Sequence, residues 1–188
     1  MATKKLKTAI QTIEPQTLTR LTRTIYFMLV VYITSLIVFD SGNLITRDAV
    51  IDHATVAFVV LVCNTFMWYA AAEQAIRKKT LLVYALSFLL IAFAGFNTYW
   101  ERGMESNSTI LYALPLLSIA TLKNRHALMA TAVLCAGTYS YAAIRYFNKF
   151  FNEGFRIQLW GTLLLISGSI FVVAWLIMVI AGLRRDSH

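Results

Sequence analysis

Charged side chains are scarce in this 188-residue sequence, and their scarcity excludes an ordinary soluble domain. They make up 14% of the residues, whereas they make up about a quarter of an average soluble protein. Hydrophobic residues account for 59%, and the mean hydropathy is +0.65. The length allows about six bilayer-spanning helices of roughly 20 residues each and leaves little for a separate soluble domain. We therefore expect any function to reside in helices and short loops.

Residues with catalytic or metal-binding chemistry are also few. The three histidines fall at different expected depths, which argues against a haem or metal site with paired histidine ligands. The sequence has no glycine-rich phosphate loop, no Ser/His/Asp grouping and no H-E-x-x-H motif. Cys63 and Cys135 both lie inside apolar runs, where a free cysteine behaves as a small hydrophobe, and whether they meet does not follow from the sequence. We expect a non-catalytic protein without a metal or cofactor.

Six apolar runs are long enough to suggest membrane spans. They lack the polar and apolar alternation of barrel strands, and lipid offers the backbone no hydrogen-bond partners, so helices are predicted. The expected fold class is all-α, a six-helix transmembrane bundle over residues 21–188. The expected spans are about residues 24–39, 51–72, 80–99, 109–122, 127–147 and 158–182.

Residues 1–20 form a basic segment ahead of the first expected span. Leu6, Ile10 and Ile13 recur at helical spacing with lysines between them, which predicts a short amphipathic helix in the membrane interface. A basic tail that only sets the topology is the alternative. No A-x-A cleavage site follows the first apolar run, so we expect a retained helix and not a signal peptide.

The distribution of lysine and arginine predicts the orientation in the membrane. With the N-terminus in the cytoplasm, twelve of the 17 basic residues face the inner side, against three of the 9 acidic residues. Both termini are then expected to be cytoplasmic in a multi-pass membrane protein. The twelve inner basic residues are Lys4, Lys5, Lys7, Arg20, Arg23, Arg77, Lys78, Lys79, Lys123, Arg125, Arg184 and Arg185.

The excess of basic residues also bears on partners. A pI near 9.7 is common among nucleic-acid-binding proteins, but these basic residues separate apolar spans and form no aromatic-interleaved face. We therefore expect no nucleic acid partner. The expected partner is the lipid bilayer, whose anionic inner-leaflet lipids attract each nearby basic residue by about 1 kcal/mol.

Polar residues expected near the middle of the membrane are few, and none of them is ionisable. This argues against a pump or an ion path built on buried carboxylates. The neutral residues Asn64 and Thr65 lie in the second expected span, and Ser118 lies in the fourth. Such groups usually bond to a neighbouring helix, with a ligand contact as the alternative.

Two features of the later spans concern helix geometry. Ala132, Ala136 and Ser140 recur every four positions, which predicts a face for close contact within the chain, with a protein partner or with a second copy. Pro115 lies inside the fourth expected span, where it removes a backbone donor and clashes with the carbonyl of Leu111. We expect a fixed kink there, with a functional hinge as the alternative.

Aromatic and charged residues gather at the expected outer depth from three separate parts of the chain. Convergence of these side chains would form a shallow outward pocket for a small molecule. An aromatic belt with solvated loop charges is the alternative, because membrane proteins commonly have one. The candidate ligand-binding residues are Asp52, His53, Asn97, Trp100, Glu101, Arg102, Tyr139, Tyr141 and Arg145.

The segment LYALPLLSIATL, residues 111–122, stands between a short polar outer turn and a tight basic inner turn at residues 123–126. An apolar helix precedes the outer turn, and an alanine-rich helix with a tyrosine follows the inner one. In this patterning, residues 81–146 resemble the multi-helix membrane sensor regions at the front of bacterial histidine kinases and diguanylate cyclases. The outer turn ERGMESNST lacks the Ser-Pro that is usual in those families. The resemblance implies a sensor region in a prokaryotic inner membrane.

The resemblance favours signalling as the function. Residues 186–188 alone follow Arg185, so we expect a signal to pass through a separate partner and not through a fused kinase or cyclase. The leading hypothesis is a non-catalytic receptor-like protein with an outward pocket. One alternative is a small transporter or channel subunit, in which Asn64, Thr65 and Ser118 line a path. Another is a structural subunit of a membrane complex, in which the small-residue faces matter most.

Overall fold

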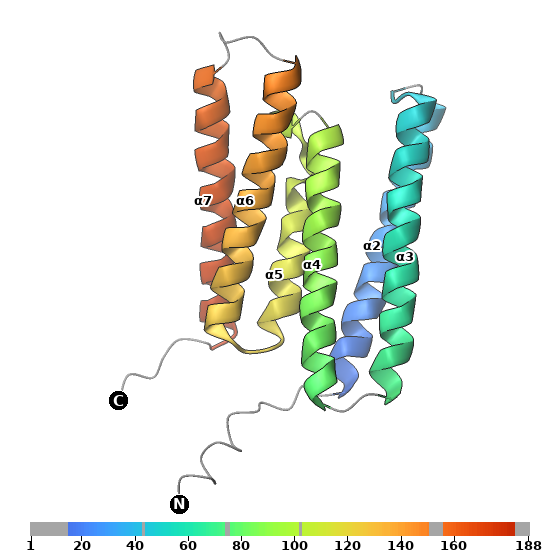
Figure 1. Ribbon diagram of the computed structural model, residues 1–188, viewed down its shortest axis with the longest axis vertical. Helices are drawn as coiled ribbons and strands as arrows, with labels where there is room; N and C mark the ends of the chain where they lie inside the picture. The colour runs from blue at the N-terminus through green and yellow to red at the C-terminus, as the bar shows by residue number, and fades with distance from the viewer. Residues whose placement is uncertain (1–14, 43, 74–75, 102, 151–155, 183–188) are drawn as a thin grey trace, which may run out of the picture.

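The structure is a computed structural model, and it describes residues 15–42, 44–73, 76–101, 103–150 and 156–182. These residues form a helical bundle without a strand, as Figure 1 shows, which confirms the all-α prediction. Most of the basic segment expected at residues 1–20 lies outside the described residues. Its expected end at residue 20 falls inside the first described helix.

Five helices are long and apolar enough to cross a membrane, which agrees with a multi-pass membrane protein. They have 25 to 27 residues, and at about 1.5 Å per residue each exceeds the roughly 30 Å hydrocarbon core. They cover five of the six expected spans and extend beyond them at one or both ends. These helices are α2 (Pro15–Ser41), α3 (Arg47–Glu73), α4 (Ile76–Trp100), α6 (Arg125–Phe150) and α7 (Arg156–Ile180).

Polar residues between the apolar runs determine where two of these helices begin. The Thr46 hydroxyl accepts a hydrogen bond from the Ala49 backbone N–H at 3.4 Å at the start of α3. At the start of α6, Asn124 Oδ1 accepts from the backbone N–H groups of His126 and Ala127 at 3.0 and 3.2 Å. Both side chains satisfy amides that have no partner inside the helix.

The fourth expected span, residues 109–122, is not a single α-helix of spanning length. It consists of a 3₁₀ helix, η2 (Asn107–Tyr112), followed by a short α-helix, α5 (Ala113–Ala120). Pro115 lies in the first turn of α5, where a missing N–H removes no helical hydrogen bond. A change from 3₁₀ to α geometry thus lies just ahead of the proline, and the expected kink stays a prediction.

Two apolar clusters hold the bundle together, and α4 contributes to both. One cluster joins α2, α3 and α4 and includes Val60 and Leu90. The other joins α4 with α5, α6 and α7 and includes Ile119 and Ala174. In Figure 1 the α2–α3 pair and the α6–α7 pair accordingly stand on opposite sides of α4 and α5.

Glycine allows one close approach between α4 and α6. A Cβ atom added to Gly95 would lie 2.4 Å from Cγ2 of Thr138, which is closer than Cβ contacts occur in proteins. A larger residue at this position would push the two helices apart, because small residues are what lets membrane helices pack closely.

The outward faces of the bundle carry large apolar side chains. On α7, Ile157, Leu164 and Ile180 are 88%, 79% and 84% exposed. Exposure of so much apolar surface to water would be costly, at about 25 cal/mol per Å², whereas hydrocarbon solvates it without penalty. These faces therefore suit contact with lipid.

The helix ends gather at two opposite ends of the bundle (Figure 1). The start of α2, the end of α7 and the loop between α5 and α6 lie together at what we call the terminal end. Arg23, Lys123 and Arg125 belong to this end. The distal end contains the end of α2, the start of α3, the end of α4 and a short 3₁₀ helix, η1 (Gly103–Glu105).

Candidate functional site

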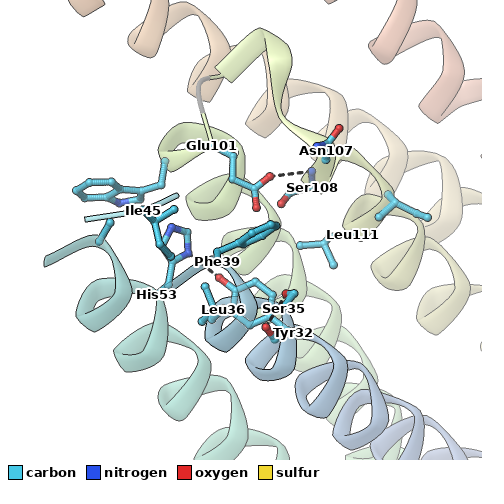
Figure 2. Close-up of a pocket in the computed structure, with 13 residues that line it drawn as sticks. Tyr32, Ser35, Leu36, Phe39, Ile45, His53, Glu101, Asn107, Ser108 and Leu111 are labelled. Atoms are coloured by element: carbon cyan, nitrogen blue, oxygen red, sulfur yellow. Dashed lines mark hydrogen bonds between the residues drawn. The ribbon is translucent and has the colours of Figure 1, made fainter. Parts of the chain in front are cut away.

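A cavity of about 540 Å³ lies at the distal end, between α2, the start of α3, the end of α4 and η2. This volume is in the range of small-molecule sites, which is about 300 to 1,000 Å³. Its wall is largely apolar and aromatic, with a few polar groups, and Figure 2 shows these side chains around a common centre. The lining residues are Tyr32, Ser35, Leu36, Phe39, Ile45, Ala49, His53, Trp100, Glu101, Asn107, Ser108, Ile110 and Leu111.

The Tyr32 hydroxyl joins three helices at the wall of the cavity. It donates to Oδ1 of Asn97 at 2.5 Å. The same oxygen lies 2.6 Å from Nδ1 of His53, as Figure 2 shows. Asn97 is fully buried, and its Nδ2 donates to the Phe93 carbonyl at 2.8 Å. Reversing the amide would set Oδ1 against that carbonyl, so the orientation of Asn97 is fixed by its surroundings.

This arrangement also fixes the ring of His53. A tyrosine hydroxyl has a single proton to donate, and Asn97 receives it. The contact between Tyr32 and His53 is then a hydrogen bond only if Nδ1 of His53 carries a hydrogen and donates it to the Tyr32 oxygen. In the neutral ring the other nitrogen, Nε2, therefore has an available lone pair.

Aromatic rings support His53 from the α4 side. Its ring meets Phe96 edge to face with centroids 5.5 Å apart, and Trp100 at 6.4 Å. Such edge-to-face pairs are favourable and set the ring planes. His53 is therefore buried, at 6% exposure, while its neighbour Asp52 on α3 is exposed and does not line the cavity.

Glu101 is held through one of its carboxylate oxygens. Oε2 accepts from the Ser106 hydroxyl at 3.2 Å and from the backbone N–H of Ser108 at 3.1 Å. Ser106 Oγ also accepts from the Ser108 N–H at 3.1 Å, which caps η2. The second oxygen, Oε1, makes no hydrogen bond within the described part of the chain, and Figure 2 shows it turned toward the centre of the group.

The candidate ligand residues thus divide into two sets. His53, Trp100 and Glu101 line the cavity, and Asn97 lies behind Tyr32 in its wall. The three candidates on α6, named below, do not line it. Arg102 lies outside the described residues.

The α6 candidates face other surroundings because α6 packs on the far side of α4. Tyr139 is fully buried edge to face against Tyr112 at 6.1 Å, and its hydroxyl has no partner among the described residues. Arg145 donates to the exposed Tyr141 hydroxyl at 3.2 Å and stands over the Tyr99 ring at 5.6 Å. This exposed pair agrees with the aromatic-belt alternative.

The polar residues expected in the middle of the membrane make helix contacts. Asn64 Nδ2 donates to the Thr22 carbonyl at 3.0 Å, and Thr65 Oγ1 accepts from the Tyr26 hydroxyl at 2.8 Å, so both connect α3 to α2. The hydroxyl of Ser118 donates to a carbonyl of its own helix. None of these three residues lines the described cavity.

The small residues of α6 lie inside the bundle. Ala132 and Ala136 are buried in the cluster that α6 shares with α7. Ser140 Oγ lies 3.4 Å from Ser167 Oγ of α7. Their closest described partners are therefore helices of the same chain.

Sequence reasoning missed the α2 wall of the cavity. Tyr32, Ser35 and Phe39 lie at helical spacing on one face of the first span, and this spacing is the signal that could have found them. Asn107 and Ser108 were also missed, because the start of η2 was expected to be a solvated turn.

Within the described part of the chain, no group of three or more His, Cys, Asp or Glu side chains is placed to hold a metal ion. Comparison with known proteins found no matching family model, no similar curated protein and no similar solved structure. The resemblance of residues 81–146 to sensor regions of histidine kinases and diguanylate cyclases therefore stays a prediction.

Proposed function

We propose that the chain is a non-catalytic membrane receptor whose distal cavity binds a small molecule from outside an inner membrane and whose cytoplasmic end contacts a partner protein. The observation that carries this proposal is the cavity itself. It is the size of a small ligand, and two of its polar groups, on His53 and Glu101, are held in place by neighbours. A fixed polar group in an apolar wall is what gives a site selectivity.

The proposal includes six membrane crossings with both termini in the cytoplasm. The segment from η2 to α5 supports the sixth crossing, because 6 residues of 3₁₀ helix and 8 of α-helix together rise about 24 Å. The short polar turns on either side add to this length. Arg23, Lys123 and Arg125 at the terminal end support its cytoplasmic location by the positive-inside rule.

Cysteine labelling tests this topology. In a background in which Cys63 and Cys135 are replaced by alanine, Asn107→Cys and Lys123→Cys place single thiols at the two ends of the η2–α5 segment. In right-side-out vesicles, an impermeant maleimide should label the first thiol directly and the second only after permeabilisation. Labelling of both thiols from the same side would contradict the sixth crossing.

A cavity-filling variant tests the receptor. Ala49 lines the cavity, whereas Ala54 lies on the same helix with an exposed side chain. Native mass spectrometry of the protein taken from its membrane in polymer-bounded discs should detect a bound small molecule. We expect Ala49→Phe to lose that molecule and Ala54→Phe to retain it. Equal occupancy in the two variants would refute the receptor proposal.

The transport alternative has less support. It requires Asn64, Thr65 and Ser118 to line a path, but their described hydrogen bonds go to α2 and to α5 itself. The structural-subunit alternative rests on Ala132 and Ala136, which are buried in the cluster that α6 shares with α4, α5 and α7 of the same chain. The cavity, in contrast, combines a volume suited to a small molecule with a Glu101 oxygen, Oε1, that makes no hydrogen bond within the described part of the chain.

A further inference from the structure

The charge and hydrogen-bonding character of the cavity wall allow the ligand class to be narrowed. We propose that the distal cavity binds a primary ammonium group carried on an apolar body, with Glu101 as its counter-ion. This inference rests on the proposed receptor function and goes further by naming the chemistry of the ligand.

The first step concerns charge. Glu101 is the one carboxylate among the described residues that line the cavity, and no lysine or arginine is among them. Its Oε2 is occupied by Ser106 and Ser108, which leaves Oε1 for a ligand. A carboxylate in an apolar wall favours a cationic partner, because an unpaired charge there is poorly solvated.

The second step concerns hydrogen bonding. Two hydroxyl donors of the wall are already used, since Tyr32 donates to Asn97, and Ser35 Oγ donates to the Tyr32 carbonyl at 2.7 Å. His53 Nδ1 donates to Tyr32, so its Nε2 is an acceptor. The wall therefore offers hydrogen-bond acceptors that favour a ligand with several N–H donors. These acceptors are Glu101 Oε1, His53 Nε2 and the lone pairs of Ser35 Oγ. A primary ammonium group has three N–H donors.

The third step concerns the surrounding rings. Trp100, Tyr32 and Phe39 line the cavity, and the face of an aromatic ring attracts a cation. Leu36, Ile110 and the other aliphatic lining residues provide room for an apolar body. The indole N–H of Trp100 and the Asn107 amide remain as donors, but neither carries a positive charge that would attract an anion.

The ammonium group could belong to a free amine or to the headgroup of an aminophospholipid. The cavity lies at the end of the bundle where α2 and α3 leave the apolar region, so both sources reach it. The probe for the first source is 2-phenylethylammonium, and the probe for the second is phosphatidylethanolamine in the disc. Discs made only of phosphatidylglycerol contain neither.

The experiment measures the thermal unfolding midpoint of the full chain in phosphatidylglycerol discs as the concentration of 2-phenylethylammonium rises. Its two isosteres, 2-phenylethanol and phenylacetate, test for the charge. Glu101→Gln removes the counter-ion, and Asp52→Asn is the matched control because it removes an exposed carboxylate outside the cavity.

We expect the ammonium to raise the midpoint of the parent protein and of Asp52→Asn, and the isosteres to have no effect. Glu101→Gln should require at least about tenfold more ammonium for the same shift. Stabilisation by phosphatidylethanolamine that Glu101→Gln abolishes would identify a lipid source, and stabilisation by the free amine alone would identify a soluble one.

Three results would overturn the ammonium proposal: an equal response of Glu101→Gln, equal stabilisation by an isostere, or no stabilisation by either amine source. Stabilisation by an isostere that is lost in Ala49→Phe would overturn the ammonium while leaving the receptor proposal intact. The two proposals therefore fail by different observations.

Discussion

The hydroxyl of Tyr32 donates to Oδ1 of Asn97 at 2.5 Å and so connects positions that are 65 residues apart in the sequence. The same hydroxyl oxygen lies 2.6 Å from Nδ1 of His53, which brings α2, α3 and α4 together at one polar point. That point forms part of the cavity wall, so the stability of the distal end and the shape of the site depend on the same atoms.

Removing this hydroxyl should destabilise the bundle. In Tyr32→Phe, the acceptor on Asn97 and the donor on His53 both lose their partner, and we expect a loss of about 1 to 2 kcal/mol in the free energy of unfolding. Titration with SDS in mixed micelles measures this change. Tyr69→Phe is the control, because Tyr69 is 71% exposed and its described contact is a ring contact with Trp68. A Tyr32→Phe protein as stable as the control would refute the bridging role.

The close approach at Gly95 predicts that a second substitution restores the stability lost by a first one. Gly95→Ala places a methyl group against Cγ2 of Thr138 and should cost about 1 to 3 kcal/mol of stability. Adding Thr138→Ser removes that Cγ2 atom and should restore most of the loss. Gly137→Ala is the matched control, since a Cβ there meets no atom within 4 Å. The same unfolding titration applies, and failure of the double variant to recover would show that the contact is not the cause.

Substitution of Asn64 distinguishes a role in helix packing from a role in transport. Its Oδ1 is buried without a described partner, while its Nδ2 bonds to the Thr22 carbonyl. Asn64→Leu removes one unfavourable and one favourable group, so we expect stability to stay within about 1 kcal/mol of the parent. Solute flux into liposomes is measured on the same two proteins. Flux in the parent that this substitution abolishes would favour the transport alternative over the receptor.

Binding of 2-phenylethylammonium should weaken as the pH falls from about 8 to about 5, a range in which an alkyl amine stays protonated. A proton on His53 converts Nε2 from an acceptor to a donor and adds a positive charge that repels the ammonium. The titratable groups around His53 are Tyr32 on α2, Glu101 after α4 and Asp52 on α3 itself. Affinity that stays constant across this range would contradict the acceptor role of His53.

The sequence predicted the apolar helices better than the direction in which individual side chains face. Long apolar runs identified five of the helices, because hydropathy reports burial in lipid directly. It did not identify the 3₁₀ geometry of Asn107–Tyr112, since a 3₁₀ and an α-helix of the same composition are equally apolar. Pro115 lies just after the change from 3₁₀ to α geometry, but a proline fits either geometry in a first turn.

The candidate site shows the same division. His53, Trp100 and Glu101 were expected to come together, and they line the same cavity at the distal end. Tyr139 was expected to join them, but it faces the opposite side of α4. Which helices are neighbours depends on packing between segments far apart in the chain, and a single sequence does not state it.

The two apolar clusters meet along α4, and Leu111, which lines the cavity, packs against both of them. Leu36 and His53 belong to the α2–α3 side, whereas Ile110 and Leu111 belong to the segment that leads into α5. An occupant would therefore press on both halves of the molecule at once, and the gap between them could widen or narrow as it arrives or leaves. Stiff helices would carry such a change in spacing along their whole length to the far side of the bilayer.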